Sequence, residues 1–207
     1  MSANVPAFLL HAFDVDELDR DEGIVVALDR DGTIVWHNST WQRFALENDG
    51  PDVPARFGVG ARYLDGISGP LRAFYESVFE SVIASQEPFE QDYECSSPDE
   101  FRLHHLRVLP IEDHGLLIEH STRALHPHGE GPSPSSDEAY RDDQGMLLQC
   151  SNCRRVHRVG DGWHWIRDWV KTPPHSTTHG LCAACAGHYF ATTRRARRVA
   201  RTKKATP

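Results

Sequence analysis

The chain has 207 residues, enough for one domain of ordinary size and a second small one, and its hydrophobic (39%) and charged (25%) fractions are those of a globular protein. No apolar run approaches the length that a membrane-spanning helix needs, which favours a soluble protein without a membrane partner. Nothing near Met1 resembles a signal peptide, so we expect a reducing, cytoplasmic environment.

Charge is distributed unevenly along the chain. The formal net charge is −8, but residues 194–207 hold seven Arg and Lys and no acid, which leaves −15 for residues 1–193. Arg194, Arg197, Arg198 and Arg201 would form one basic face if a helix ran through them, because their spacing is three and four residues. Two interpretations stay open for this tail: a solvated end, or a surface that binds nucleic acid or an acidic partner without sequence specificity.

The first 23 residues mix apolar and acidic side chains in a way that predicts one amphipathic cap helix from Phe8 to Arg20. Two β-branched runs then flank Asp29-Arg-Asp-Gly32, which predicts a hairpin. Asn38 or a residue just after it can cap a following helix that contains Trp41.

A long helix is predicted over residues 71–85, the clearest helical stripe in the chain. Its apolar residues recur at steps of three and four: Leu71, Phe74, Tyr75, Val78, Phe79, Val82 and Ile83. Strands are predicted at 89–95, 101–111 and 116–121. Because apolar and acidic residues alternate in the first of these strands, we expect Cys95 at its end to be buried or half-buried.

Two strands, several helices and three strands predict an α+β fold over residues 24–123. This is the element order of a PAS domain, and the sequence resembles that family. Leu28-Asp-Arg-Asp-Gly-Thr-Ile34, with Asn38 and Trp41, resembles L-D-x-D-G-x-I followed by N-x-x-W. Residues 93–104 are similar to the pattern Y-x-C-H-S-P-x-E-x-R-W-F of one bacterial subgroup, with Ser96 in place of His and Leu103-His104 in place of the aromatic pair. The resemblance implies a five-stranded antiparallel sheet with flanking helices, a small ligand or protein partner, and a capacity to form homodimers.

Flavin and haem signatures are missing from the sequence. The pattern G-x-N-C-R-F-L-Q of flavin-binding relatives does not occur, and the predicted long helix lacks the His that usually binds haem. We therefore interpret His37, His104, His105 and His120 as surface or strand histidines rather than ligand contacts, and leave the ligand pocket unassigned. The G-x-S-x-G, P-loop and H-E-x-x-H motifs are also missing, which predicts that the protein is not an enzyme.

Residues 124–145 are rich in Pro, Ser, Gly and His and predict a flexible linker. The next segment, 146–193, holds four of the five cysteines as two C-x-x-C pairs: Cys150, Cys153, Cys182 and Cys185. Two such pairs supply four sulfur ligands from two tight turns, the pattern of a structural zinc site. Disulfides and unpaired thiols remain alternatives, whereas covalent haem is excluded because Arg154 and Ala186 stand where it needs His.

The residues around the two pairs predict a treble-clef-like finger. Gly180 and the small residues after it predict a turn and then a helix that carries Cys185. Arg154, His157 and His179 are candidates to support the sulfur ligands from outside, and His179 could instead replace one of them.

The segment also resembles a small C-terminal module of bacterial PAS-domain and response-regulator proteins, with the patterns C-x-x-C-K-x-I-R, G-Y-W-x-x-L-x-x-Y-I and S-H-G-I-C-P-x-C. Residues 150–156, 163–170 and 178–185 stand for these parts, with Arg154 for Lys, Thr178 for Ser and Ala183 for Pro. The two resemblances imply a sensory or regulatory signalling protein. The alternatives are an enzyme with an open zinc site, or a regulator that binds nucleic acid through the finger and tail.

Overall fold

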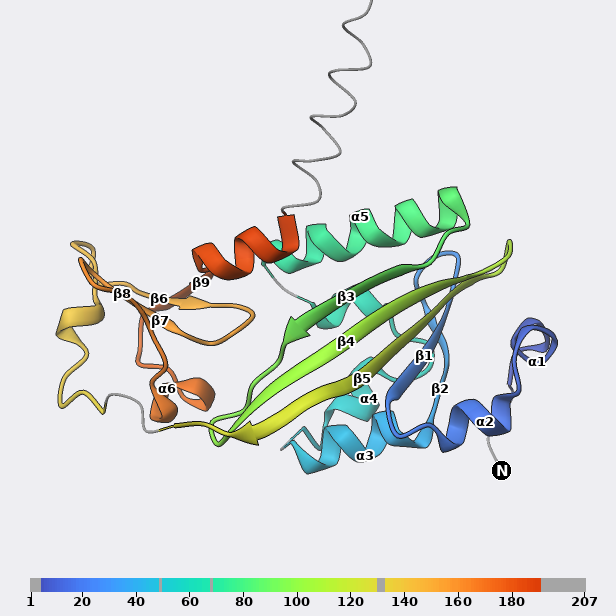
Figure 1. Ribbon diagram of the computed structural model, residues 1–207, viewed down its shortest axis with the longest axis horizontal. Coiled ribbons are helices and arrows are strands. Elements are labelled where there is room, and N and C mark those ends of the chain that lie inside the picture. Colours follow the sequence, from blue (N-terminus) through green and yellow to red (C-terminus); the bar gives the residue numbers. More distant parts are fainter. Residues whose placement is uncertain (1–4, 49, 68, 130–132, 191–207) are drawn as a thin grey trace, which may run out of the picture. The chain divides into compact units, whose positions relative to one another are not determined.

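The computed structural model describes residues 5–48, 50–67, 69–129 and 133–190 (Figure 1). The predicted basic face at 194–201 lies outside these residues. The chain divides into two compact units. The sheet unit is made of the described residues of Met1–Ser68, Tyr75–Cys95 and Phe101–His126, and the cysteine unit is made of those of Gly69–Phe74, Ser96–Glu100 and Pro127–Pro207. No helix within the described ranges is long and apolar enough to cross a membrane.

The sheet unit contains a five-stranded antiparallel sheet in the order β2-β1-β5-β4-β3. The strands are β1 (Ile24–Asp29), β2 (Ile34–His37), β3 (Phe89–Glu94), β4 (Glu100–Ile111) and β5 (Gly115–Pro127). The predicted hairpin is confirmed, since β1 pairs antiparallel with β2. Its turn forms because Gly32 adopts a φ of 78° and the Asp29 carboxylate accepts hydrogen bonds from the N–H groups of Asp31 and Thr33 at 3.0 and 2.8 Å.

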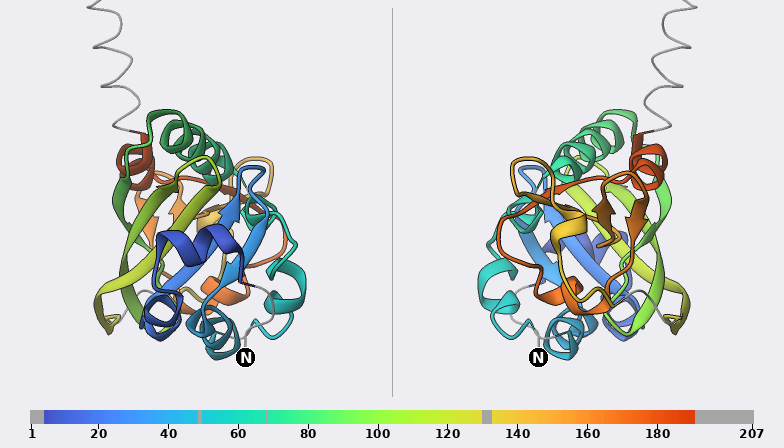
Figure 2. Two further views of the ribbon diagram at one scale, coloured as in Figure 1. Left: turned by 90° about the vertical axis from the view of Figure 1, so that its right-hand side faces the viewer. Right: turned by 90° about the vertical axis from the view of Figure 1, so that its left-hand side faces the viewer.

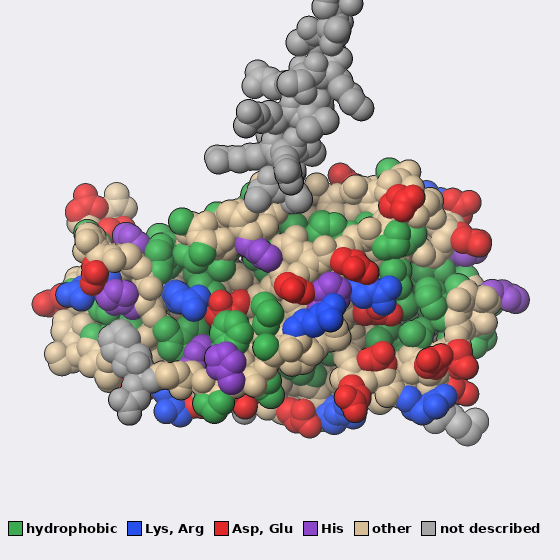
Figure 3. Space-filling view, in the orientation of Figure 1, with side chains coloured by type: hydrophobic (Ala, Val, Ile, Leu, Met, Phe, Trp, Pro, Cys, Tyr) green, Lys and Arg blue, Asp and Glu red, His purple; other side chains and the backbone are tan. Residues whose placement is uncertain are grey.

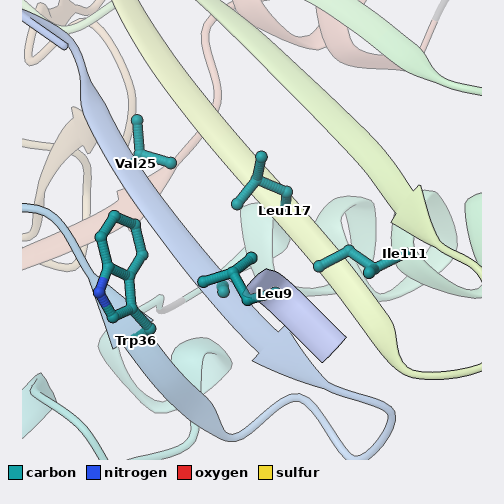
Figure 4. Close-up of a cluster of buried hydrophobic side chains, with 6 residues drawn as sticks. Leu9, Val25, Trp36, Ile111 and Leu117 are labelled. Atoms are coloured by element: carbon teal, nitrogen blue, oxygen red, sulfur yellow. The ribbon is translucent and has the colours of Figure 1, made fainter. Parts of the chain in front are cut away.

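One face of the sheet is covered by the N-terminal helices α1 (Ala7–Ala12) and α2 (Val15–Arg20), seen beside β1 in Figure 2. Fully buried Leu9 from α1 packs there in a cluster whose other buried members are Val25, Ala27, Trp36, Ile111 and Leu117 (Figure 4). Because neighbouring residues of a strand point to opposite faces, the buried Val26 and Leu28 face the other side. Strand β1 is therefore buried on both faces.

The prediction of a single cap helix is wrong at its centre. The Asp14 carboxylate accepts hydrogen bonds from the N–H groups of Asp16 and Glu17, both at 3.1 Å, and so caps a second helix instead of continuing the first. Phe13 has extended backbone angles, and α1 ends before it. α1 and α2 are therefore separate helices, and each can take its own orientation against the sheet.

Between β2 and β3 the described residues form four helices: α3 (Ser39–Glu47), α4 (Val53–Phe57), η1 (Tyr63–Gly66) and α5 (Pro70–Ser85). Asn38 caps α3, since its side chain accepts a hydrogen bond from the Trp41 N–H. The predicted apolar stripe of α5 is buried at Tyr75, Val78, Phe79 and Val82.

The outward face of strands β3 to β5 is polar, and Figure 3 shows acidic, basic and histidine side chains there. Arg107 pairs with Glu90 at 3.0 Å and with Glu119 at 2.7 Å, and His105 Nδ1 lies 2.7 Å from Asp92. Side chains at alternate positions of β4, such as the buried His104, point to the opposite face.

The cysteine unit has its own four-stranded sheet, in the order β8-β7-β6-β9. The elements are η2 (Glu138–Tyr140), β6 (Leu147–Cys150), β7 (Val156–Arg158), β8 (Gly162–His164), α6 (Arg167–Lys171) and β9 (Thr177–Gly180), followed by helical residues 183–190. Its small core consists of Tyr140, Leu147, Val156 and Ile166, with Trp169 packed against them.

The structure differs from the predicted linker at 124–145. Strand β5 continues to Pro127, and Tyr140 is buried in the core of the cysteine unit, with its hydroxyl 2.9 Å from His164 Nδ1. Arg141 forms an isolated β-bridge with Leu147. Tyr140, an aromatic residue in a polar segment, thus holds this part of the chain against the core of the cysteine unit. The composition of the segment alone does not indicate that contact.

The burial of the α5 stripe predicts a large difference between neighbouring positions. Phe79 is 6% exposed and its ring centre lies 5.8 Å from that of Tyr63, whereas Glu80 is exposed. Phe79→Ala should lower the free energy of unfolding of the sheet unit by roughly 3–5 kcal/mol because it leaves a cavity. Glu80→Ala should change it by less than about 0.5 kcal/mol. Urea titration measures both values, and equal effects would contradict the assigned helix face.

Candidate functional site

The structure brings the four cysteines of the two C-x-x-C pairs together. Their sulfur atoms all lie within 4.8 Å of one another, and all four residues are buried. Cys153 Sγ lies 3.8 Å from Cys182 Sγ, far longer than a disulfide bond of about 2.05 Å. A tetrahedral metal ion with bonds of about 2.3 Å to sulfur requires sulfur pairs roughly 3.8 Å apart. The cluster therefore fits a metal ion such as zinc.

Two turns hold the sulfur atoms. Cys150 ends β6 and Cys153 lies in the turn to β7. Cys182 lies just before the helical residues 183–190, and Cys185 lies in their first turn. The first turn closes because Arg154 adopts a φ of 62° and its N–H donates to the Cys150 carbonyl at 3.1 Å. This left-handed conformation is strained for a residue other than glycine.

Hydrogen-bond donors point at the sulfur atoms. The N–H groups of Cys182 and Cys185 donate to the sulfurs of Cys150 and Cys182, both at 3.4 Å. Asn152 Nδ2 donates to Cys185 Sγ at 3.3 Å, and the Tyr189 hydroxyl donates to Asn152 Oδ1 at 2.6 Å. Such donors stabilise negative sulfur ligands. Sequence reasoning missed Asn152, although its place inside the first C-x-x-C pair was a signal.

The thiols also affect one another's ionisation. Hydrogen bonds from Cys153 and Cys185 lower the pKa of Cys150. Hydrogen bonds with Cys150 and Cys185, together with burial, raise the pKa of Cys153. A separate hydrogen bond with Cys150 raises the pKa of Cys185 to about 12. Hydrogen bonds among Cys150, Cys153 and Cys185 thus favour one thiolate in this group and oppose the loss of further protons. A bound cation would allow all four sulfurs to lose their protons.

The other predicted residues of this site lie around the cluster. His157 is half-buried on β7 with its ring centre 5.2 Å from that of Trp163, and His179 is exposed on β9. The ligand group found in the described part of the chain consists of four cysteines without His179. Arg154 shapes the turn through its backbone. That the side chains of Arg154, His157 and His179 support the sulfur ligands stays a prediction.

A cavity of about 310 Å³ lies in the sheet unit, between the sheet and α3. It is lined by Ile24, Val26, Trp41, Phe44, Ala45, Asn48, Gly50, Val53, Tyr63, Tyr93, Cys95, His104 and His120. The lining is mainly apolar and aromatic, with a few hydrogen-bonding groups, as is usual for small-molecule sites.

Two of the four histidines interpreted as surface or strand residues line this cavity: His104 lies on β4 and His120 on β5, so their placement on strands is confirmed. His104 is 6% exposed, and its ring stacks on Tyr93 with centres 5.5 Å apart. His120 bridges two tyrosines, with Nε2 3.0 Å from the Tyr63 hydroxyl and Nδ1 2.7 Å from the Tyr93 hydroxyl. Sequence periodicity placed these residues on strands but could not show that their side chains meet.

Cys95 also departs from expectation. It lies just after β3 and is exposed, so the prediction of a buried or half-buried position is wrong. The alternation that suggested burial ends with the strand at Glu94. Cys95 nevertheless lines the cavity and offers its thiol at the edge of it.

The wall of the cavity is electrically neutral near pH 7. Burial, with a smaller effect from His104, lowers the pKa of His120 to about 4. Burial and the nearby charge of Arg102 lower the pKa of His104. Burial raises the pKa of Tyr63, so its hydroxyl keeps its proton.

Comparison with known proteins assigns no family. No family model matches the sequence, and no curated protein matches it. The crystal structure of the phage VqmA–DPO complex is similar, with a TM-score of 0.38 and 10% identity over 52% of this chain and 50% of that chain. The match spans about half the length of the phage protein, and it is too weak to carry an argument about function.

Metal binding predicts a specific count of reactive thiols. With metal bound, a thiol reagent should modify one cysteine, the exposed Cys95, because the other four are buried ligands. After treatment with a chelator, all five should react, and the tryptophan fluorescence of the cysteine unit should change as it unfolds. Purified protein that contains no metal, or whose thiol count ignores the chelator, would contradict the site.

The low pKa of His120 predicts the effect of acid on the sheet unit. Unfolding restores the pKa from about 4 to the ordinary 6.5, so the unfolded chain takes up a proton first as the pH falls. The free energy of unfolding of the sheet unit is therefore highest above pH 6.5. It falls by roughly 3 kcal/mol as the pH is lowered towards 4. The NMR signal of the His120 ring should keep its neutral position from pH 7 to about pH 5. His120→Gln should make the free energy of unfolding depend less on pH between 6.5 and 4. An NMR titration of the His120 ring with its midpoint near pH 6.5 would contradict the lowered pKa.

Proposed function

We propose that this chain is a ligand-responsive regulatory protein. In this proposal the sheet unit is a PAS domain that binds a small molecule in its cavity, and the cysteine unit is a structural zinc module. The observation that carries the proposal is the cavity of about 310 Å³ between the sheet and α3. Its volume lies at the lower end of the range for small-molecule sites, roughly 300–1,000 Å³.

Two features support the assignment to the PAS family. The observed element order, two strands, several helices and three strands, is the order that the resemblance implies. In addition, Trp41, Tyr93 and Cys95, which belong to the motifs N-x-x-W and Y-x-C, all line the cavity. Three of the residues that carry the resemblance therefore lie where a ligand would bind.

The chemistry of the cysteine cluster supports a structural ion rather than a catalytic one. A catalytic zinc keeps one position for water or substrate and usually has three protein ligands. Here four buried sulfurs can fill a tetrahedron. We therefore propose that the protein is not an enzyme and that zinc holds the cysteine unit in its folded form, as in other small metal-dependent modules.

Native mass spectrometry of freshly purified, zinc-loaded protein tests the proposal. The unmodified chain should carry a bound small molecule. Ala45→Trp should lose it, because buried Ala45 lines the cavity and the indole would fill that space. Leu46→Trp is the matched control, since the neighbouring Leu46 is 55% exposed. Circular dichroism verifies the fold of both variants. Two results would overturn ligand binding in this cavity: an unmodified chain that carries no small molecule, or an Ala45→Trp variant that still carries it.

A further inference from the structure

We infer that Asn152 is a positioning residue of the metal site: Tyr189 holds its side chain, which donates a hydrogen bond to Cys185 and makes that sulfur less reactive. The inference rests on the proposed function, because it requires that a metal ion such as zinc binds the four cysteines. It depends on three observations: how deeply each cysteine is buried, where the hydrogen bonds to the sulfurs come from, and what fixes the Asn152 side chain.

The first observation is that the four cysteines are not equally buried. Cys150 and Cys153 are fully buried, whereas Cys182 is 3% exposed and Cys185 is 8% exposed. Cys185 is therefore the least buried of the four residues, and a reagent from solution has its easiest approach there. The sulfur that most needs protection is the one that Asn152 contacts.

The second observation is the origin of the hydrogen bonds. Backbone N–H groups donate to three of the sulfurs, those of Cys150, Cys153 and Cys182. Cys185 instead receives Nδ2 of Asn152 at 3.3 Å, and no backbone N–H in the described ranges donates to it. A substitution cannot remove a backbone N–H, but it can remove a side chain. The support of Cys185 can thus be tested without changing the donors of the other sulfurs.

The third observation is that Tyr189 fixes which end of the Asn152 carboxamide faces the sulfur. The Tyr189 hydroxyl donates to Asn152 Oδ1 at 2.6 Å. Because a carboxamide donates only through nitrogen and accepts only through oxygen, this bond leaves the nitrogen for Cys185. A metal-bound thiolate has no proton and can only accept. The opposite orientation would place Oδ1 against a negative sulfur and would lose a hydrogen bond.

Tyr189 is itself held by the packing of its ring. It is 3% exposed, and its ring meets that of Phe74 edge-on with centres 4.9 Å apart. Phe74 belongs to the segment Gly69–Phe74, which is part of the cysteine unit although it lies far earlier in the chain. The packed ring keeps the Tyr189 hydroxyl within reach of Asn152, so each residue in this series limits the movement of the next.

A hydrogen bond changes the chemistry of a metal-bound sulfur. Four thiolates and one divalent cation carry a net negative charge, which N–H donors spread over neighbouring dipoles. A donor lowers the energy of the sulfur lone pair and so makes the sulfur a weaker nucleophile. Without Asn152, Cys185 would carry more of the negative charge and would be less restrained.

Three variants of the full chain separate the parts of this arrangement, with zinc affinity measured in competition with a chromophoric chelator. Asn152→Ala removes the donor and should weaken zinc binding about 10- to 100-fold. Asn152→Asp still offers an acceptor to the Tyr189 hydroxyl but places a carboxylate against the sulfur, so it should weaken binding at least as much. Tyr189→Phe keeps the ring against Phe74 and loses only the hydroxyl, which should weaken binding about 3- to 10-fold.

Ser151→Ala is the matched control. Ser151 lies in the same turn, and within the described part of the chain its hydroxyl has no hydrogen-bond partner. This substitution should change zinc affinity by less than about 2-fold. Circular dichroism at saturating zinc verifies that all four variants fold.

Two further readouts would not respond to a purely structural role. With saturating cobalt(II) in place of zinc, the sulfur-to-cobalt charge-transfer band of Asn152→Ala should lie at longer wavelength than that of the unmodified chain, because the lone pair is higher in energy. In limited alkylation of the zinc-loaded variant by iodoacetamide, mass spectrometry of the peptides should show Cys185 as the first metal ligand to react. In Ser151→Ala the band and the order of reaction should stay as in the unmodified chain.

The outcomes separate this inference from the proposed function. If the unmodified chain binds neither zinc nor cobalt, the structural metal site and this inference both fail. If it binds them but Asn152→Ala has the same affinity and the same charge-transfer band, the metal site stands and Asn152 has no part in it. Alkylation of Asn152→Ala that begins at a ligand other than Cys185 would overturn the protection of that sulfur.

Discussion

A polar atom buried without a partner costs roughly 1–3 kcal/mol, and this constraint shapes both units of the protein. Asn38 is fully buried in the sheet unit and satisfies its whole carboxamide. Its oxygen accepts from the N–H groups of Val25 and Trp41, both at 3.1 Å, and its nitrogen donates to the Gly23 carbonyl at 2.8 Å. One side chain thus fixes the start of β1 to the first turn of α3, the helix that borders the cavity.

The same constraint explains the cysteine unit. Four buried thiols lie close together, and local donors such as the Asn152 side chain stabilise negative charge on sulfur without supplying a full positive charge. A divalent cation supplies that charge and joins two turns that lie about thirty residues apart in sequence. In the cavity, by contrast, the protein leaves Nε2 of His104 unpartnered. The sulfur cluster and this nitrogen are both positions where the chain alone does not complete its own interactions.

Features that depend on local chemistry were predictable from the sequence. The turn after Asp29 and the buried stripe around Phe79 follow from neighbouring residues, and the C-x-x-C spacing pointed to a cluster. Features that depend on distant contacts were not. The cap at Asp14 divided a periodic segment, and Tyr140 became a core residue only because the cysteine unit encloses it. His104 was assigned to a strand, but its contact with Phe44, which lies 60 residues earlier in the chain, could not be predicted from local sequence.

The central claim is that a small molecule binds in the cavity of about 310 Å³ in the sheet unit. The most direct measurement is a high-resolution crystal structure of the full chain purified rapidly from its native host. The account predicts electron density for a small molecule in the cavity, in contact with lining residues such as Trp41 and Tyr93. A cavity closed by its own side chains, or one that holds only solvent, would contradict it.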